Sequence, residues 1–107
     1  MSIFIVDTYV VKPEKQEEFT SFIQRFLKYR KENPKKFKEW KSWKIFRQGF
    51  GDISGAYVEM MEFENMADAE EWGTRMRKDE VMMKIREAFM LLIDPTTHSM
   101  KLWHTIM

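Results

Sequence analysis

The chain has 107 residues, of which 44% are hydrophobic and 15% aromatic, so it is expected to fold as one domain spanning residues 1–107 rather than stay disordered. Its 18 Lys and Arg residues nearly balance 17 Asp and Glu residues, which argues against a globally basic nucleic-acid binder. Without Cys, and with only two His, it can form neither a disulfide framework nor a thiolate or three-His metal site.

The first residues and the hydropathy pattern indicate the compartment. The apolar run 3–6 stops at Asp7 and has no basic segment before it, unlike a signal peptide. No apolar run approaches the roughly 20 residues that cross a bilayer. We therefore expect a cytoplasmic protein that does not engage a membrane.

The first half of the chain predicts a strand, a helix and a hairpin. Residues 3–11 predict a strand with apolar side chains on both faces, interrupted at Asp7. Pro13 is suited to open a helix, which Asn33-Pro34 should end. After a basic connection at 34–39, two further strands are expected at 40–48 and 56–64, joined by a glycine-rich loop at 49–55.

The second half predicts a helix in two parts and a last strand. Asn65 is a good N-cap for the first part, and Asp79 for the second, which should stop at Asp94-Pro95. The last strand is expected at 96–106. The resulting β-α-β-β-α-β order is typical of a ferredoxin-like α+β fold with a four-stranded antiparallel sheet.

This fold covers only one face of its sheet with helices, and the other face here is also apolar. Such an exposed patch would exceed what soluble monomers tolerate, so a homodimer with facing sheets, closing a barrel, is expected. The alternative is a monomer in which segment 34–55 folds over the sheet.

The sequence resembles the dimeric α+β barrel superfamily, especially the antibiotic-biosynthesis-monooxygenase-like domains, over nearly its whole length. The resemblance rests on chain length, on the opening Val11-Lys12-Pro13-Glu14-Lys15 followed by Glu17-Glu18-Phe19, and on the stretch from Tyr57 to Trp72. It implies a small-molecule role, and its quinol-oxidising members imply a monooxygenase that uses no metal or flavin. Members of the superfamily differ in activity, so fold alone does not decide function.

The haem-degrading members of the superfamily are a poor match. They carry Asn in strand 1, Trp at the end of strand 3 and His in the following helical region. The matching positions here are Asp7, Phe63 and segment 82–85, which has no His. These three differences argue against haem degradation.

Four titratable residues are candidates for catalysis. Asp7 and Glu59 interrupt apolar strands, and a carboxylate in an apolar barrel interior would have a raised pKa suited to deprotonating a phenol. The structural alternative for Asp7 is an ion pair with Arg47 or Lys101. His98 and His104 share a strand face but lie roughly 20 Å apart, too far to share a metal, so each could act only as a separate base.

Aromatic side chains are candidates for holding a flat ligand, although aromatics at such spacings are more often core residues. The candidate substrate-binding residues are Trp43, Tyr57, Trp72 and Trp103. Within this set, Trp43, Tyr57 and Trp103 are expected to line the barrel interior together with the two acids. No cofactor and no metal are expected.

Charge is strongly segregated along the chain. Segment 28–44 has eight basic and two acidic residues, whereas segment 52–80 has nine acidic and three basic ones. Complementary packing of the two segments is favoured over nucleic-acid binding by the basic segment, because no nucleic-acid motif is present.

These observations favour a small-molecule-handling dimer, with a cofactor-free monooxygenase acting on an aromatic, phenolic or quinol substrate as the specific hypothesis. The alternative is a non-catalytic dimer that binds small hydrophobic molecules or is associated with stress.

Overall fold

The computed structural model describes all residues from 1 to 107. A single sheet and three helices account for most of them, joined by short 3-10 turns at Pro13–Lys15 and Pro34–Phe37. In chain order the elements are β1 (Ile3–Val11), α1 (Gln16–Glu32), β2 (Ser42–Arg47), β3 (Tyr57–Phe63), α2 (Met66–Arg77), α3 (Glu80–Leu92) and β4 (Ile93–His104).

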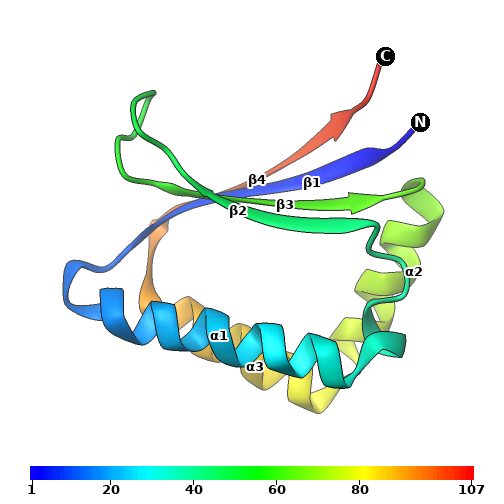
Figure 1. The fold of residues 1–107 in the computed structure, drawn as a ribbon, viewed down its shortest axis with the longest axis horizontal. Coiled ribbons are helices and arrows are strands. Elements are labelled where there is room, and N and C mark those ends of the chain that lie inside the picture. Colours follow the sequence, from blue (N-terminus) through cyan, green and yellow to red (C-terminus); the bar gives the residue numbers. More distant parts are fainter.

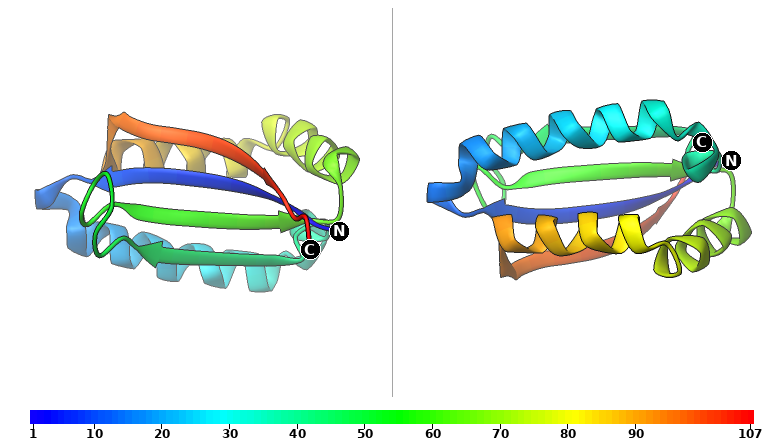
Figure 2. Two further views of the ribbon diagram at one scale, coloured as in Figure 1. Left: turned by 90° about the horizontal axis from the view of Figure 1, so that it is seen from above. Right: turned by 90° about the horizontal axis from the view of Figure 1, so that it is seen from below.

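The four strands form one antiparallel sheet in the order β2-β3-β1-β4. Figure 1 shows the sheet as one layer and the helices as a second layer on one side of it, with α2 at one end. Seen from the helix side in Figure 2, α1 and α3 run along the sheet side by side. The predicted ferredoxin-like α+β fold is thereby confirmed.

Local signals in the sequence explain where the helices begin. The Asn65 side chain accepts a hydrogen bond from the Asp68 backbone N–H at 2.9 Å and caps α2. The Asp79 side chain accepts one from the Met82 backbone N–H at 3.1 Å and caps α3. Both N-caps were predicted, because a side-chain oxygen satisfies an amide that the first helical turn leaves unpaired.

The last strand differs from the prediction, because it begins at Ile93, includes Asp94-Pro95 and ends at His104 rather than spanning 96–106. A register shift opposite Thr8–Val10 makes room for the proline, which cannot donate to a sheet. The Val10 backbone N–H donates instead to Oγ1 of Thr97 at 2.9 Å. A bulge thus replaces the expected break between helix and strand.

The predicted second and third strands are slightly shorter than expected, since β2 begins at Ser42. Before it, Phe37 and Trp40 turn inward and are buried on the helix side of the sheet. The monomeric alternative requires segment 34–55 to fold over the open face of the sheet. Its first part, residues 34–40, lies instead on the helix side.

The core between sheet and helices consists of two apolar clusters. One contains Phe37, Trp40, Phe63 and residues of α2, and the other contains Tyr9, Phe19, Phe22 and the end of α3. Along β1 and β3, Asp7 and Glu59 occupy the register positions between the two clusters. A polar row therefore separates the two halves of the core.

The opposite face of the sheet carries no helix. Its apolar side chains include two that are each 48% exposed, Phe46 and Trp103. The others, which the strand register places on the same face, are Phe4, Val6, Val10, Val58 and Met60.

No helix of the structure has the length and apolar character needed to cross a membrane.

Candidate functional site

Asp7 lies at the middle of the central strand β1, on the face covered by the helices. Its register partner on β3 is Glu59, and His98 of β4 lies beside it with Nε2 3.5 Å from the Asp7 Oδ1. The side chains of Asp7 and His98 are 13% and 22% exposed. Burial raises the pKa of the Asp7 carboxyl, and the nearby His98 opposes that rise.

Glu59 is the second carboxyl of this group. Burial, and to a smaller extent the charge of Asp7, raise its pKa to about 8, while the Tyr9 hydroxyl acts in the opposite direction. The Tyr9 side chain is fully buried, and burial together with the neighbouring carboxylates raises its pKa above the ordinary value. At neutral pH this site therefore holds Glu59 mainly as the neutral acid and Tyr9 as the neutral phenol.

Three polar atoms of the group are buried without a hydrogen-bond partner. They are Oδ1 of Asp7, the Tyr9 hydroxyl and Nε2 of His98. The 3.5 Å contact between Asp7 and His98 is longer than an N–H···O hydrogen bond ordinarily is. Because buried polar atoms in proteins are nearly always paired with protein groups or ordered water, these three atoms still have hydrogen-bonding capacity.

Aromatic rings surround the polar group. Tyr9 contacts Phe89 edge-on at 4.8 Å between ring centroids and stacks on Tyr57 at 6.0 Å. Tyr57 also lies 4.8 Å from Phe19, and its hydroxyl donates to Oε1 of Gln16 at 3.3 Å. These contacts fix the rings and leave an apolar wall beside the acids.

The four predicted catalytic residues are divided by the fold. Asp7, Glu59 and His98 lie together, but His104 is exposed near the other end of β4, where its register partner is Ile3. Neither predicted ion-pair partner of Asp7 pairs with it. Lys101 is the strand-register partner of Val6, so it lies on the opposite face of the sheet. The guanidinium carbon of Arg47 lies 5.5 Å from the centroid of the Tyr57 ring.

The two acids were expected to line a chamber between facing sheets, but they lie on the face of the sheet that the helices cover. Asp7 and Glu59 share the face of Tyr9, which packs against helical Phe19 and Phe89. The two carboxyls therefore lie in the layer between the sheet and the helices of one chain. A strand exposes alternate residues to opposite faces, so only contacts with the helices could decide this point.

The predicted aromatic wall is also divided, and only Tyr57 borders the acids. Trp43 and Trp72 belong to the other cluster, where they lie 6.0 and 5.2 Å from Trp40. Trp103 is on the opposite face of the sheet, paired with Phe4. Trp43, Tyr57 and Trp103 therefore cannot line one chamber.

Sequence reasoning missed Tyr9 and Phe89 as members of the site. Tyr9 could have been found, because it lies two residues after Asp7 on the same strand face. Nothing in the sequence marked Phe89 as part of the site, since apolar residues at its helical spacing are ordinary core residues.

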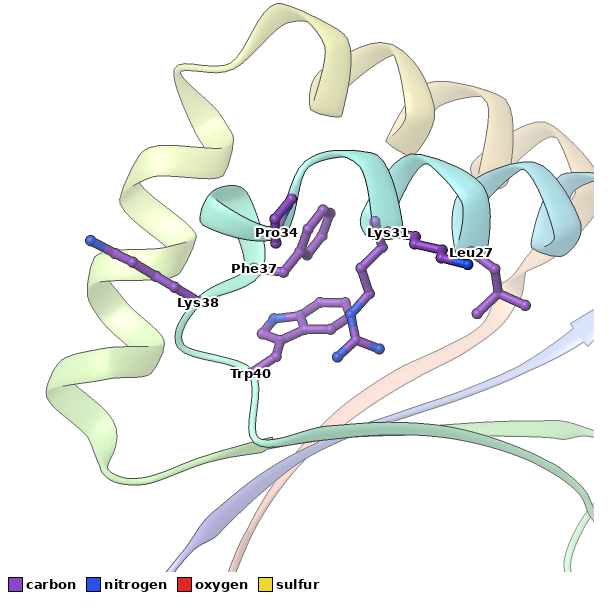
Figure 3. A pocket seen from close by; sticks show the side chains of 7 residues that line it. Leu27, Lys31, Pro34, Phe37, Lys38 and Trp40 are labelled. Carbon is purple, nitrogen blue, oxygen red and sulfur yellow. The ribbon is translucent and has the colours of Figure 1, made fainter.

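The surface has two prominent hollows, of about 560 and 510 Å³, and neither is lined by the polar group. The first lies at the end of α1 and in the turn that follows, as Figure 3 shows. The second lies between α1 and α3 on their outer side. Nowhere do three His, Asp or Glu side chains converge closely enough to hold a metal ion.

No protein-family model matches the chain, and no curated protein sequence matches it either. Several solved structures, in contrast, are similar to it. A NIPSNAP family protein from Agrobacterium tumefaciens superposes with a TM-score of 0.74 at 12% identity, over 98% of this chain and 87% of its own. A candidate antibiotic biosynthesis monooxygenase from Caulobacter crescentus gives 0.72 at 15% identity, over 99% and 91%.

A third similar structure is a variant of SnoaB, a cofactor-independent oxygenase from Streptomyces nogalater. It superposes with a TM-score of 0.67 at 14% identity, over 99% of this chain and 94% of its own. The resemblance found in the sequence is thus confirmed at the level of the fold, which this chain shares with antibiotic biosynthesis monooxygenase-like and NIPSNAP proteins. At such low identity the likeness concerns the fold alone.

Proposed function

We propose that the chain binds a flat phenolic or quinol molecule between its sheet and its helices and oxidises it with O₂ without a cofactor. The observation that carries this proposal is the group of three buried, unpartnered polar atoms on Asp7, Tyr9 and His98, enclosed by aromatic rings. The fold shared with SnoaB, a cofactor-independent oxygenase, supports the reaction class.

In this proposal Asp7 is the general base. Its raised pKa brings it closer to that of a substrate hydroxyl, and His98 beside it stabilises the carboxylate until the proton arrives. The Tyr9 hydroxyl donates a hydrogen bond to the resulting phenolate. Glu59, held neutral, adds no negative charge that would repel it.

The phenolate supplies the electrons for the reaction. It gives one electron to O₂, and the substrate radical and superoxide combine into a carbon–oxygen bond. The peroxide formed takes up a proton and loses water. For a substrate with a ring CH₂ group, two C–H bonds and the O–O bond break, one C=O bond forms, and one O₂ gives one ketone oxygen and one water.

Oxygen uptake with 1,8-dihydroxyanthrone tests the proposal. We expect protein-dependent uptake above autoxidation, with one O₂ consumed per substrate. Asp7→Asn should lower the rate by about 100-fold or more, the usual contribution of a general base. Saturable binding without oxygen uptake would support the non-catalytic alternative, and neither binding nor uptake would contradict both.

His104→Gln is the matched control for His98→Gln. Both residues lie on the same face of β4, but His104 is exposed and outside the polar group. His104→Gln should leave oxygen uptake unchanged, and His98→Gln should lower it. Melting temperatures of all variants must stay close to that of the unchanged protein for the comparison to hold.

We also propose that two chains associate through the open faces of their sheets. The apolar face that no helix covers, with Phe46 and Trp103 half exposed, supports this assembly. Sedimentation equilibrium should give about twice the 13.1 kDa mass of the chain. Val58→Lys should shift the mass towards the monomer, and a monomer at micromolar concentration of the unchanged protein would contradict the assembly.

A further inference from the structure

The hollow at the end of α1 has basic residues at its margin and apolar residues beneath. It has a volume of about 560 Å³, within the range of small-molecule sites. Its lining comes from the last turns of α1 and from the segment that follows, and Figure 3 shows Phe37 and Trp40 lying against each other there. The lining residues are Leu27, Arg30, Lys31, Pro34, Phe37, Lys38 and Trp40.

The three cations of this hollow have no carboxylate partner, unlike Lys36, Lys41 and Arg75. Lys36 pairs with Asp79 at 2.8 Å, Lys41 with Glu64 at 2.8 Å, and Arg75 with Glu39. Arg30, Lys31 and Lys38 form no ion pair, and no acidic residue lines the hollow. The hollow therefore presents unneutralised positive charge.

Arg30 is held in a defined position. Its guanidinium carbon lies 5.2 Å from the centroid of the Trp40 ring, a cation–π contact that orients the guanidinium and leaves N–H donors for an anion. The Trp40 side chain is 92% buried, and its Nε1 has no hydrogen-bond acceptor. A guanidinium held over the apolar floor of the hollow is suited to a carboxylate or phosphate group.

Helix polarity explains only part of this arrangement. The carbonyl end of α1 favours cations, which accounts for Arg30 and Lys31 in its last turns. It does not account for the ring of Trp40, which lies below the guanidinium. An aromatic ligand with one anionic group would use all of these features.

We propose that this hollow binds a small aromatic molecule carrying one carboxylate or phosphate group. Arg30 binds the anionic group, Lys31 adds attraction at the margin, and Leu27, Pro34 and Phe37 contact the ring. The site is distinct from the polar group around Asp7, none of whose residues line the hollow. It therefore does not depend on the oxidation proposed above.

Titration with 2-naphthoate, followed by the NMR signal of the Trp40 indole N–H, tests this proposal. We expect a saturable shift at this indole, with binding weakened about tenfold or more by Arg30→Gln, as for a lost charge-assisted hydrogen bond. Arg25→Gln is the matched control, because Arg25 is on the same helix but lines the other hollow. That variant, and Asp7→Asn, should leave binding unchanged.

Two further probes separate the chemistry of the ligand. Neutral 2-naphthamide should bind at least about tenfold more weakly than 2-naphthoate, since it lacks the charge that Arg30 recognises. A comparison with 1-naphthyl phosphate then shows whether carboxylates or phosphates are preferred, and saturable binding of either supports the site. Equal binding of the amide, no effect of Arg30→Gln, or tighter binding of oligothymidylate than of both anions would overturn the proposal.

Discussion

Glu39 is buried and Glu59 is half-buried, both on the helix side of the sheet, yet their surroundings are opposite. The Glu39 side chain, 6% exposed, accepts hydrogen bonds from Arg75 on both oxygens, at 2.5 and 2.8 Å. These bonds are the main reason that the pKa of Glu39 is lowered. Glu59 has no cationic partner, and burial raises its pKa to about 8.

The difference shows how the chain uses buried charge. At Glu39 the ion pair, extended by a bond from Arg75 to the Lys36 carbonyl oxygen at 2.9 Å, ties the turn before β2 to α2. At Glu59 and Asp7 burial makes the carboxyls costly to ionise, and no Lys or Arg forms an ion pair with either of them. The first region therefore stabilises a charged carboxylate, whereas the second favours the neutral acid.

The largest effect is expected from breaking the ion pair. Arg75→Met leaves the Glu39 carboxylate buried without a partner and should lower the free energy of unfolding by about 3 kcal/mol, as for other broken buried pairs. Urea denaturation measures this change. The double variant Glu39→Met with Arg75→Met should be more stable than Arg75→Met alone. A double variant that is less stable would contradict our account of the pair.

The second effect concerns pH. Glu59 keeps its proton up to about pH 8 in the folded chain, whereas its ordinary pKa is 4.5, so the unfolded state binds fewer protons between these values. Stability conferred by the neutral acid is full below the ordinary pKa and declines as pH rises towards 8. Between about pH 6 and pH 8 the decline should amount to about 2 kcal/mol.

Glu59→Gln should remove most of this decline. Urea denaturation at the two pH values should give nearly equal stability for the variant and falling stability for the unchanged protein. The pKa of Asp7 is also raised by burial, so any change that it adds has the same sign. Parallel curves for the two proteins would show that Glu59 ionises at its ordinary pKa.

The smallest effect on stability is expected at Tyr9. Because its hydroxyl faces Glu59 without a hydrogen bond of ordinary geometry, Tyr9→Phe should change the free energy of unfolding by less than about 1 kcal/mol. Binding of a phenol should nevertheless weaken about tenfold, since the phenolate loses a donor. Calorimetric titration with 1,8-dihydroxyanthrone under nitrogen measures this binding. Tyr57→Phe is the control, because that hydroxyl donates to Gln16 instead.

Much of the fold could be predicted because its signals are local. Alternating apolar residues marked β1, Asn65 and Asp79 marked two helix starts, and the glycine-rich stretch marked the hairpin between β2 and β3. The start of β4 was missed because Pro95 is compatible with a strand only at a bulge, and the bulge depends on pairing with Thr8 and Val10.

The sequence by itself determined that Asp7 and Glu59 interrupt apolar strands, since alternation within a strand needs no other information. Only the tertiary structure decided which face of the sheet the helices cover, and hence that His98 and Tyr9 join the acids while Trp103 and His104 do not. The same holds for Glu39 and Arg75, which are 36 residues apart in the chain. Whether a buried carboxyl is paired depends on residues brought near it by packing, and that pairing sets its charge.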